Sequence, residues 1–267
     1  MSGEADSWIN IEEAPAVSAA ASVRLHERGG VGACPLGMCD GSGFLLDEAT
    51  STASDCRCRA ARIAGARSAR LEGRLPRMYE GVWFDRNPVP QIERVAPEQV
   101  AAVRRYVRDI RANIERGRGL WFWGEVGTGK TTLAMLVSRA AIEAGCSVAI
   151  YSLPRLLNLL RESMESPGGL VELLDRLGCV DLLHIDDLGA ENRTPWVLEQ
   201  LYSIVNARYE DRRAIVATTN LEVERLGEHL GERTVSRLVE MCGDPIVLDG
   251  DDKRKEYRPR EIDRPGL

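Results

Sequence analysis

The sequence has no long apolar run, no secretory leader pattern and no excess of positive charge. No stretch approaches the ~20 apolar residues that a bilayer-spanning helix needs, so no membrane segment is expected. Met1–Ala33 is small and polar, without the basic-then-apolar order of a signal peptide, which favours a cytoplasmic location. The net charge of −6 argues against wholesale nonspecific binding to nucleic acid, and we detect no internal repeat.

The composition that remains is that of an ordinary folded protein. Of 267 residues, 44% are hydrophobic and 28% are charged, enough for one large domain and a small one. The seven cysteines are an odd number, and a cytoplasmic chain rarely keeps disulfides. Four of them form a cluster in the sequence: Cys34, Cys39, Cys56 and Cys58. The others are scattered and expected to be small core residues: Cys146, Cys179 and Cys242.

The strongest single motif is a glycine-rich loop between a strand-like run (Gly119–Trp123) and a helix-like run (Lys130–Ala144). It matches G-x-x-x-x-G-K-[ST], whose backbone N–H groups and following helix N-terminus form a cradle for phosphates. Lys130 is expected to reach the β- and γ-phosphates of ATP, and Thr131 to offer its hydroxyl to Mg²⁺. The alternative is a chance glycine-rich turn. The residues expected to bind ATP are Gly124, Glu125, Val126, Gly127, Thr128, Gly129, Lys130, Thr131 and Thr132.

Two acidic residues follow the apolar strand Val180–Ile185. Parallel sheets place ligands at the carboxyl ends of their strands, so Asp186 is expected beside the phosphate loop, holding Mg²⁺. Asp187 is expected to orient or activate the attacking water in phosphoryl transfer. A simple turn after a strand is the alternative for this pair. His184, inside the strand, is expected to be a core residue.

Polar residues also follow the next strand, Ala214–Thr218. Asn220 is placed to contact the γ-phosphate or the water, or else is a polar turn residue. Further along, Arg233 and Arg237 are four residues apart and share one helix face. Such arginines stabilise a transferring phosphoryl group, in ring-forming ATPases from the neighbouring subunit. The alternative is a surface helix with ion pairs.

Short apolar strands alternate with helical segments, which predicts an α/β fold with a parallel sheet covered by helices on both faces. The remaining expected strands are Leu120–Trp123, Ser147–Tyr151 and Pro245–Leu248. The expected helices are Glu98–Arg116, Leu153–Glu165, Leu170–Leu177, Thr194–Asp211, Val223–Leu230 and Glu232–Met241.

The expected organisation has five parts. They are a mobile N-terminal segment (1–32) with one short helix at Val17–Arg28, a cysteine- and arginine-rich module (33–75), a proline-containing linker (76–96), the ATPase domain (97–250) and a charged tail (251–267). From Arg57 to Arg77 there are seven arginines and one acid, Glu72. This basic stretch is either a solvated helix face or a surface that binds a partner.

The motif set resembles AAA+ ATPases of the DnaC/DnaI helicase-loader and IstB transposition-helper group. The resemblance rests on Gly124–Thr131, on the segment beginning His184-Ile185-Asp186-Asp187, on Ala217–Asn220 and on Gly231–Leu238, and it covers about Pro97 to Leu248. It implies a P-loop NTPase fold without a substantial helical lid. It also implies that the two acids form Walker B, that Asn220 is sensor 1 and that Arg237 is the arginine finger, with Arg233 one turn earlier.

The resemblance extends to the cysteines, which look like the N-terminal zinc module of DnaI-type loaders. Four thiolates are a typical tetrahedral Zn²⁺ site, although the C-x4-C and C-x-C spacing departs from the usual C-x2-C pairs. Reduced, unliganded cysteines are the alternative. The segments Leu75–Tyr79 and Trp83-Phe84 resemble the part of the family that packs near the adenine.

The implied function is an ATP-hydrolysing accessory factor of DNA replication that loads or remodels the replicative DNA helicase on single-stranded DNA. Its expected partners are that helicase, single-stranded DNA and further copies of itself in an ATP-dependent oligomer. An IstB-like transposition helper is one alternative. A nucleotide-gated DNA-binding module with little hydrolysis is another, because Asp187 is shorter than the glutamate common at its position.

Overall fold

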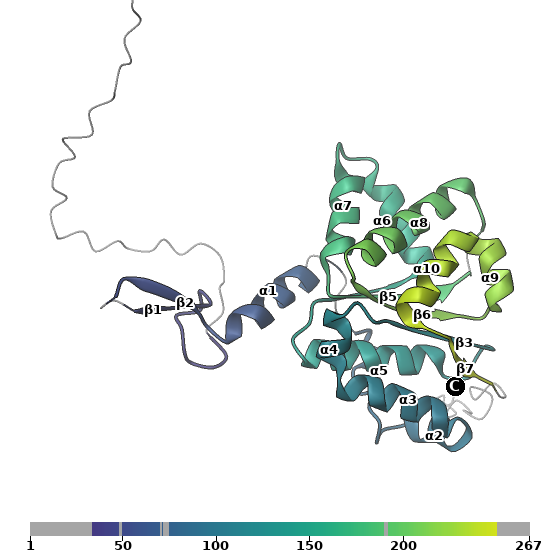
Figure 1. The fold of residues 1–267 in the computed structure, drawn as a ribbon, viewed down its shortest axis with the longest axis horizontal. Helices are drawn as coiled ribbons and strands as arrows, with labels where there is room; N and C mark the ends of the chain where they lie inside the picture. Colours follow the sequence, from purple (N-terminus) through teal and green to yellow (C-terminus); the bar gives the residue numbers. More distant parts are fainter. Residues whose placement is uncertain (1–33, 48–49, 70, 72–74, 190–191, 250–267) are drawn as a thin grey trace, which may run out of the picture.

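The computed structural model describes residues 34–47, 50–69, 71, 75–189 and 192–249. The segment 1–32, with its expected helix at Val17–Arg28, and the tail 251–267 lie outside the described residues. Within the described part, no helix is both long enough and apolar enough to cross a bilayer. Figure 1 shows a layered body that contains the larger sheet, with a small hairpin and one helix beside it.

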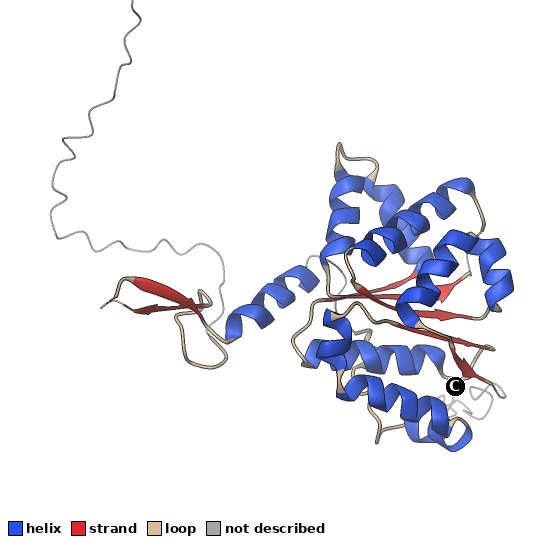
Figure 2. Ribbon diagram, in the orientation of Figure 1, coloured by secondary structure: helices blue, strands red, loops and turns tan. Residues whose placement is uncertain are grey.

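The body is built on a five-stranded sheet in the order β4-β5-β6-β3-β7, and all of its pairings are parallel. The strands are β3 (Leu120–Gly124), β4 (Val148–Ser152), β5 (Leu182–Leu188), β6 (Ala214–Thr219) and β7 (Ile246–Leu248). Helices lie on both faces of the sheet (Figure 2). The predicted α/β architecture with a covered parallel sheet is therefore confirmed.

Side chains alternate between two cores, one on each face of the sheet. In β3, Trp121 packs into one core and Phe122 into the other, and both are fully buried. Since neighbouring residues of a strand point to opposite faces, a continuous apolar strand can supply both cores. In β6, likewise, Ile215 lies in the first core and Val216 in the second.

The second core is covered by the segment before the phosphate loop and by the helix after it. These helices are α2 (Val89–Val95), α3 (Pro97–Arg108), α4 (Ile110–Glu115) and α5 (Lys130–Glu143). The prediction of one helix over Glu98–Arg116 is wrong, because the chain leaves helical geometry at Asp109, where ψ is 30°. The break re-aims the chain so that Ile110 and Ile114 are buried.

Residues 76–96, expected to be a linker, contain the 3₁₀ turn η1 (Arg77–Tyr79) and helix α2. Pro90 lies in the first turn of α2, where its missing N–H removes no intrahelical hydrogen bond. Val89, Ile92 and Ala96 recur at helical spacing and are buried against the second core. Pro88 and Pro90 therefore mark the start of a packed helix and not an unstructured linker.

The first core is covered by the remaining helices, and their expected positions are confirmed within a few residues. They are α6 (Leu153–Ser163), α7 (Gly169–Cys179), α8 (Pro195–Glu210), α9 (Val223–Leu230) and α10 (Glu232–Cys242). Cys146 is buried and Cys242 half-buried, but Cys179 is exposed at the end of α7, so its expected core position is wrong.

The N-terminal module is a hairpin of β1 (Phe44–Asp47) and β2 (Thr52–Asp55), paired antiparallel and followed by α1 (Cys58–Ala69). Its core consists of Cys34, Cys56 and Cys58, with Cys39 and Leu45 packed against it. Because so few apolar side chains are buried, the hydrophobic effect alone gives this module little stability. The arginine-rich stretch lies partly in α1, where Arg59 stacks 3.8 Å from the Phe44 ring centroid.

A fully buried arginine connects the amino ends of β5 and β6. Arg208 of α8 donates to the carbonyls of Leu177 (2.6 Å), Asp181 (3.2 Å) and Ala214 (2.6 Å). Burial lowers the pKa of Arg208 to about 9, so the side chain remains charged at neutral pH. Removing it would leave these carbonyls without their donor.

We predict that Arg208→Met lowers the free energy of unfolding by about 3 kcal/mol, because buried carbonyls lose charged donors. Arg105→Met on the exposed face of α3 is the matched control and should change it by less than about 0.5 kcal/mol. Urea denaturation of the full chain measures both. Equal midpoints for the two variants would contradict the structural role assigned to Arg208.

Candidate functional site

The phosphate loop connects β3 to α5 and approaches its neighbours too closely for side chains at two positions. A Cβ at Gly124, where φ is +151°, would lie 2.1 Å from the Leu248 carbonyl oxygen. A Cβ at Gly129, where φ is +105°, would lie 2.4 Å from Ile92 Cδ1. Glycine is therefore required at both positions, and the loop is packed directly against α2 and β7.

Lys130, the first residue of α5, is almost completely buried in the loop. Its Nζ donates to the carbonyls of Gly124 (2.7 Å) and Glu125 (2.6 Å). Thr128 also donates to the Glu125 carbonyl, at 2.9 Å. These contacts hold the ammonium group inside the curve of the loop, which is where the lysine of this motif binds phosphate oxygens.

Asp186 joins the phosphate loop to the centre of the sheet. The Thr131 hydroxyl donates to its Oδ1 (3.0 Å), and the Thr218 hydroxyl of β6 donates to the same atom (2.7 Å). Burial raises the pKa of Asp186, but the His184 ring and these two hydroxyls lower it more, so the pKa lies below its ordinary value. A charged carboxylate beside a hydroxyl is the oxygen donor set that Mg²⁺ prefers.

Asp187 has an unusual backbone, with φ of +59°, at the point where the register between β5 and β6 shifts. Its N–H donates to Thr218 Oγ1 at 2.9 Å. Left-handed geometry is uncommon outside glycine and is concentrated at functional sites. His184 is fully buried and bonded through Nδ1 to Ser138 Oγ at 2.9 Å, which confirms its expected place in the core.

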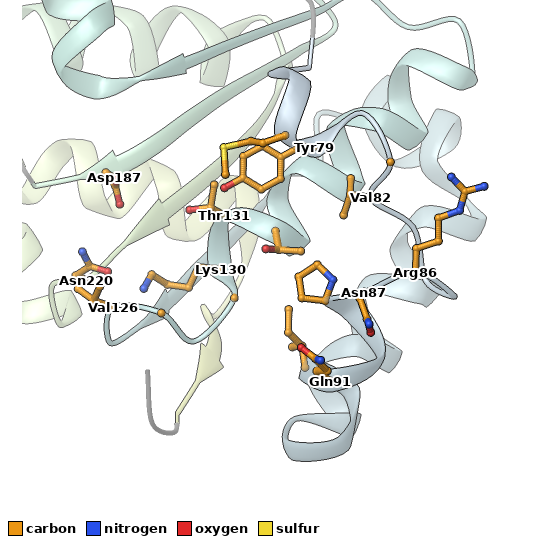
Figure 3. A pocket seen from close by; sticks show the side chains of 17 residues that line it. Tyr79, Val82, Arg86, Asn87, Gln91, Val126, Lys130, Thr131, Asp187 and Asn220 are labelled. Atoms are coloured by element: carbon orange, nitrogen blue, oxygen red, sulfur yellow. The ribbon is translucent and has the colours of Figure 1, made fainter. Parts of the chain in front are cut away.

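A cavity of 740 Å³ opens beside the loop. Eight of the predicted residues line it: Val126, Gly127, Gly129, Lys130, Thr131, Thr132, Asp187 and Asn220. Figure 3 shows Asp187 and Asn220 on the side opposite Gln91, with Lys130 and Thr131 between them. Gly124, Glu125 and Thr128 do not line the cavity, but the carbonyls of Gly124 and Glu125 accept hydrogen bonds from Lys130 or Thr128. Asp186 does not line it either, and it contacts the loop through its hydrogen bond from Thr131.

The other half of the cavity comes from residues 78–92, which lie within the expected linker (76–96) and include Tyr79 of the segment expected by resemblance near the adenine. It is lined by Met78, Tyr79, Gly81, Val82, Arg86, Asn87, Pro88, Gln91 and Ile92. Mostly apolar walls with a few amide groups suit a flat heterocycle such as a nucleobase. The helical spacing of Val89, Ile92 and Ala96 was the signal that could have located this wall.

Arg233 and Arg237 do not reach this cavity. They lie with Tyr202, Tyr209 and Glu240 around a separate hollow between α8 and α10. The Arg237 guanidinium carbon stacks 4.7 Å from the Tyr202 ring centroid and 5.6 Å from that of Tyr209. The structure therefore brings the loop, the two acids and Asn220 together, but leaves both arginines on another surface of the chain.

The four N-terminal cysteines meet at one point, with all four sulfur atoms within 4.8 Å of one another. The backbone N–H of Cys39 lowers the pKa of Cys34 to about 6, whereas burial raises the pKa of Cys58 to about 12. These shifts favour one thiolate in the cluster. A state with several thiolates would need a nearby cation, because the negative charges repel one another. The donor set and its compactness fit a tetrahedral zinc site.

Comparison with known proteins gives concordant similarities. The replicative helicase loader DnaC of Escherichia coli K12 is 29% identical over 140 residues, 52% of this chain and 56% of that protein. The replicative helicase loader DnaI of Bacillus subtilis 168 is 27% identical over 151 residues, 52% of this chain and 48% of that protein. The chain thus spans about half the length of the curated relatives it matches.

Among solved structures, the crystal structure of the DnaC helicase loader superposes with a TM-score of 0.56 at 25% identity, covering 66% of this chain and all of that chain. AMPPCP-bound DnaA from Aquifex aeolicus, with a TM-score of 0.50 at 23% identity, covers 62% of this chain and 48% of that one and shares the fold. The fold is the AAA+ fold of DnaC and DnaA. The sequence profile of "IstB-like ATP binding protein" matches residues 98–255, more than half of the chain. The chain belongs to the IstB-like ATP-binding family of AAA+ ATPases.

Proposed function

We propose that this protein is an AAA+ accessory factor of DNA replication, which loads or remodels a replicative DNA helicase on single-stranded DNA and uses ATP hydrolysis as its switch. The observation that supports the proposal is that the residues we assign to catalysis lie in two separate places. The phosphate loop, Asp187 and Asn220 line one cavity, whereas Arg237 lies on a different surface of the same chain. Such a chain needs a second copy to complete its site.

Within one subunit we assign the following roles. Lys130 and the loop amides hold the phosphates, Thr131 and Asp186 hold Mg²⁺, and Asp187 and Asn220 position the attacking water near the γ-phosphate. When bound, Mg²⁺ would neutralise charge that develops on the phosphate oxygens. The short distance between Thr131 Oγ1 and Asp186 Oδ1, 3.0 Å, supports placing the cation there.

The neighbouring subunit would supply Arg237, supported by Arg233 one helical turn earlier. An arginine finger provided in trans stabilises the transferring phosphoryl group and makes hydrolysis depend on assembly. We keep the division between the cysteine-rich module and the ATPase domain, but we assign α2 to the wall of the ATPase cavity and not to a linker. In this arrangement ATP state controls self-association around single-stranded DNA or on the helicase.

A second candidate is a transposition helper that recruits a transposase to DNA, and the match of the IstB-like profile to residues 98–255 favours it. The resemblance to DnaC over the ATPase portion supports helicase loading instead. Both candidates use the same nucleotide site and differ in the partner. Affinity capture from the native host with ATP present separates them, since either a replicative helicase or a transposase should be the main bound protein.

We expect Lys130→Ala to lose ATP binding, and Arg237→Ala to bind ATP normally while losing at least about tenfold in steady-state hydrolysis. Because each variant retains the half of the site that the other lacks, a mixture of the two should regain part of the wild-type rate. Measurements of ATP affinity and phosphate release on each protein and on the mixture provide the test.

The matched control is Arg105→Ala, which removes an exposed arginine from α3 and should hydrolyse ATP like the wild type. If the mixture is no more active than its components, or if Arg237→Ala is as active as the control, Arg237 does not act in trans. If the wild type binds no Mg·ATP, the proposed function as a whole fails.

We also propose that Cys34, Cys39, Cys56 and Cys58 hold a structural Zn²⁺. The support is the convergence of their sulfur atoms together with the small apolar core of the module. A bound metal would contribute the folding free energy that so small a module lacks. A folded module of this kind, carrying the basic helix α1, would serve as the part that grips the partner protein.

The purified full-length protein should contain about one zinc per chain. Cys58→Ser should lose most of that zinc and lower the melting temperature of the module, because only three thiolates remain. Cys179→Ser, which removes an exposed cysteine outside the cluster, should retain it. Metal analysis and cobalt substitution, which gives thiolate charge-transfer bands, measure this. A wild-type protein that takes up neither metal would refute the zinc assignment.

A further inference from the structure

One segment of the nucleotide cavity is held in place by polar contacts as well as by packing. This segment, residues 76–84, is called the strap. It contributes Met78, Tyr79, Gly81 and Val82 to the wall of the cavity. Met78 is 80% exposed, while Tyr79 is only partly buried. The opposite part of that wall, α2, is fixed by packing, since Ile92 is buried directly against Gly129 of the phosphate loop.

The side chain of Arg139 ties the strap to α5. Its Nη1 donates to the backbone carbonyls of Glu80 (3.1 Å) and Val82 (2.8 Å). Its guanidinium carbon lies 5.2 Å from the ring centroid of Trp83, within range of a cation–π contact. Of the four consecutive strap positions 80–83, all but Gly81 are therefore engaged by this single side chain.

The orientation of Arg139 is itself fixed from the other side. Its Nε donates to Glu143 Oε1 at 2.8 Å, one turn later on α5, and its side chain is only 23% exposed. Because Nε is occupied by Glu143, the guanidinium plane is set and Nη1 is directed at the strap. The helix that carries Lys130 and Thr131 at its first turn thus also carries the anchor of the strap.

Arg139 does not line the cavity. It lies eight residues after Thr131 on α5, about 12 Å further along the helix axis at 1.5 Å per residue. It is therefore too distant to act on the phosphates, and its effect on a nucleotide must pass through the strap. The strap faces the half of the cavity that the phosphate loop does not occupy, which is the half available to the base and sugar.

We infer that Arg139 is a positioning residue for nucleoside recognition: it holds the strap on α5, so that the cavity binds the base of ATP in addition to its triphosphate. The inference rests on the proposed binding of ATP at the phosphate loop. It deepens that proposal, because it assigns the triphosphate and the nucleoside of ATP to two walls of the cavity that are held in place by different contacts. The phosphate half depends on the loop, and the nucleoside half depends on the Arg139–strap contacts.

The test compares two ligands, Mg·ATP and Mg·inorganic triphosphate, by calorimetric titration of the full-length protein. Arg139→Ala should weaken ATP binding roughly tenfold, because the strap loses two charge-assisted hydrogen bonds. Its affinity for inorganic triphosphate should change by less than about twofold, because that ligand reaches only the loop. A general loss of structure would weaken both ligands together.

Arg105→Ala is the matched control, since it removes an exposed arginine of α3 that does not line the cavity. Its ATP affinity should stay within about twofold of wild type. Arg139→Lys retains the charge and should give an intermediate loss, and it substitutes for the alanine variant if that protein does not fold. Parallel changes for the two ligands, or no change for either, would overturn the inference. A wild type that binds neither ligand would instead refute the proposed nucleotide site.

Discussion

One hydroxyl group, that of Thr218 on β6, connects the parts of the candidate site. It accepts a hydrogen bond from the N–H of Asp187 at 2.9 Å and donates one to Asp186 at 2.7 Å. Asp186 in turn accepts from Thr131 at the start of α5. Because β6 pairs with both β3 and β5, the strand that carries Thr218 also sets the spacing between the phosphate loop and the acids. The site is thus anchored in the most buried strand of the sheet, not in its loops.

Much of this arrangement follows from strand periodicity, and the sequence predicts it well. Successive strand residues face opposite sides, so Leu182, His184 and Asp186 share one face of β5. Leu182 packs in the second core and His184 bonds to Ser138 of α5, which fixes that face toward α5. An acid two residues further along the same face must then emerge beside the start of α5. Strand periodicity does not predict the orientation of Asp187, because the register shift that changes its direction is not visible in the sequence.

The parts that the sequence did not predict depend on packing between distant segments. Residues 76–96 were expected to be a linker because prolines punctuate them, and only the resemblance placed Leu75–Tyr79 and Trp83-Phe84 near the adenine. Helix α2 is held by the contact of Ile92 with Gly129, which lie far apart in the chain. The contacts of Arg139 with the strap likewise join residues nearly sixty positions apart. The compact cysteine cluster was anticipated from residue type, but the hairpin that brings Cys39 to Cys58 was not. Local propensity carries no information about such pairings.

The surroundings of Arg237 suit its proposed role in the site of a neighbouring subunit. Its guanidinium lies against the rings of Tyr202 and Tyr209, while its buried Nε makes no hydrogen bond to the described residues. Stacking on aromatic faces stabilises the cation, yet it leaves the planar N–H edge uncommitted to any carboxylate. An arginine paired bidentately with an acid would have to break that pair before it could meet a phosphate. The stacked rings orient Arg237 without an ion pair that would first have to be broken. Completing the proposed site therefore depends mainly on bringing two copies together.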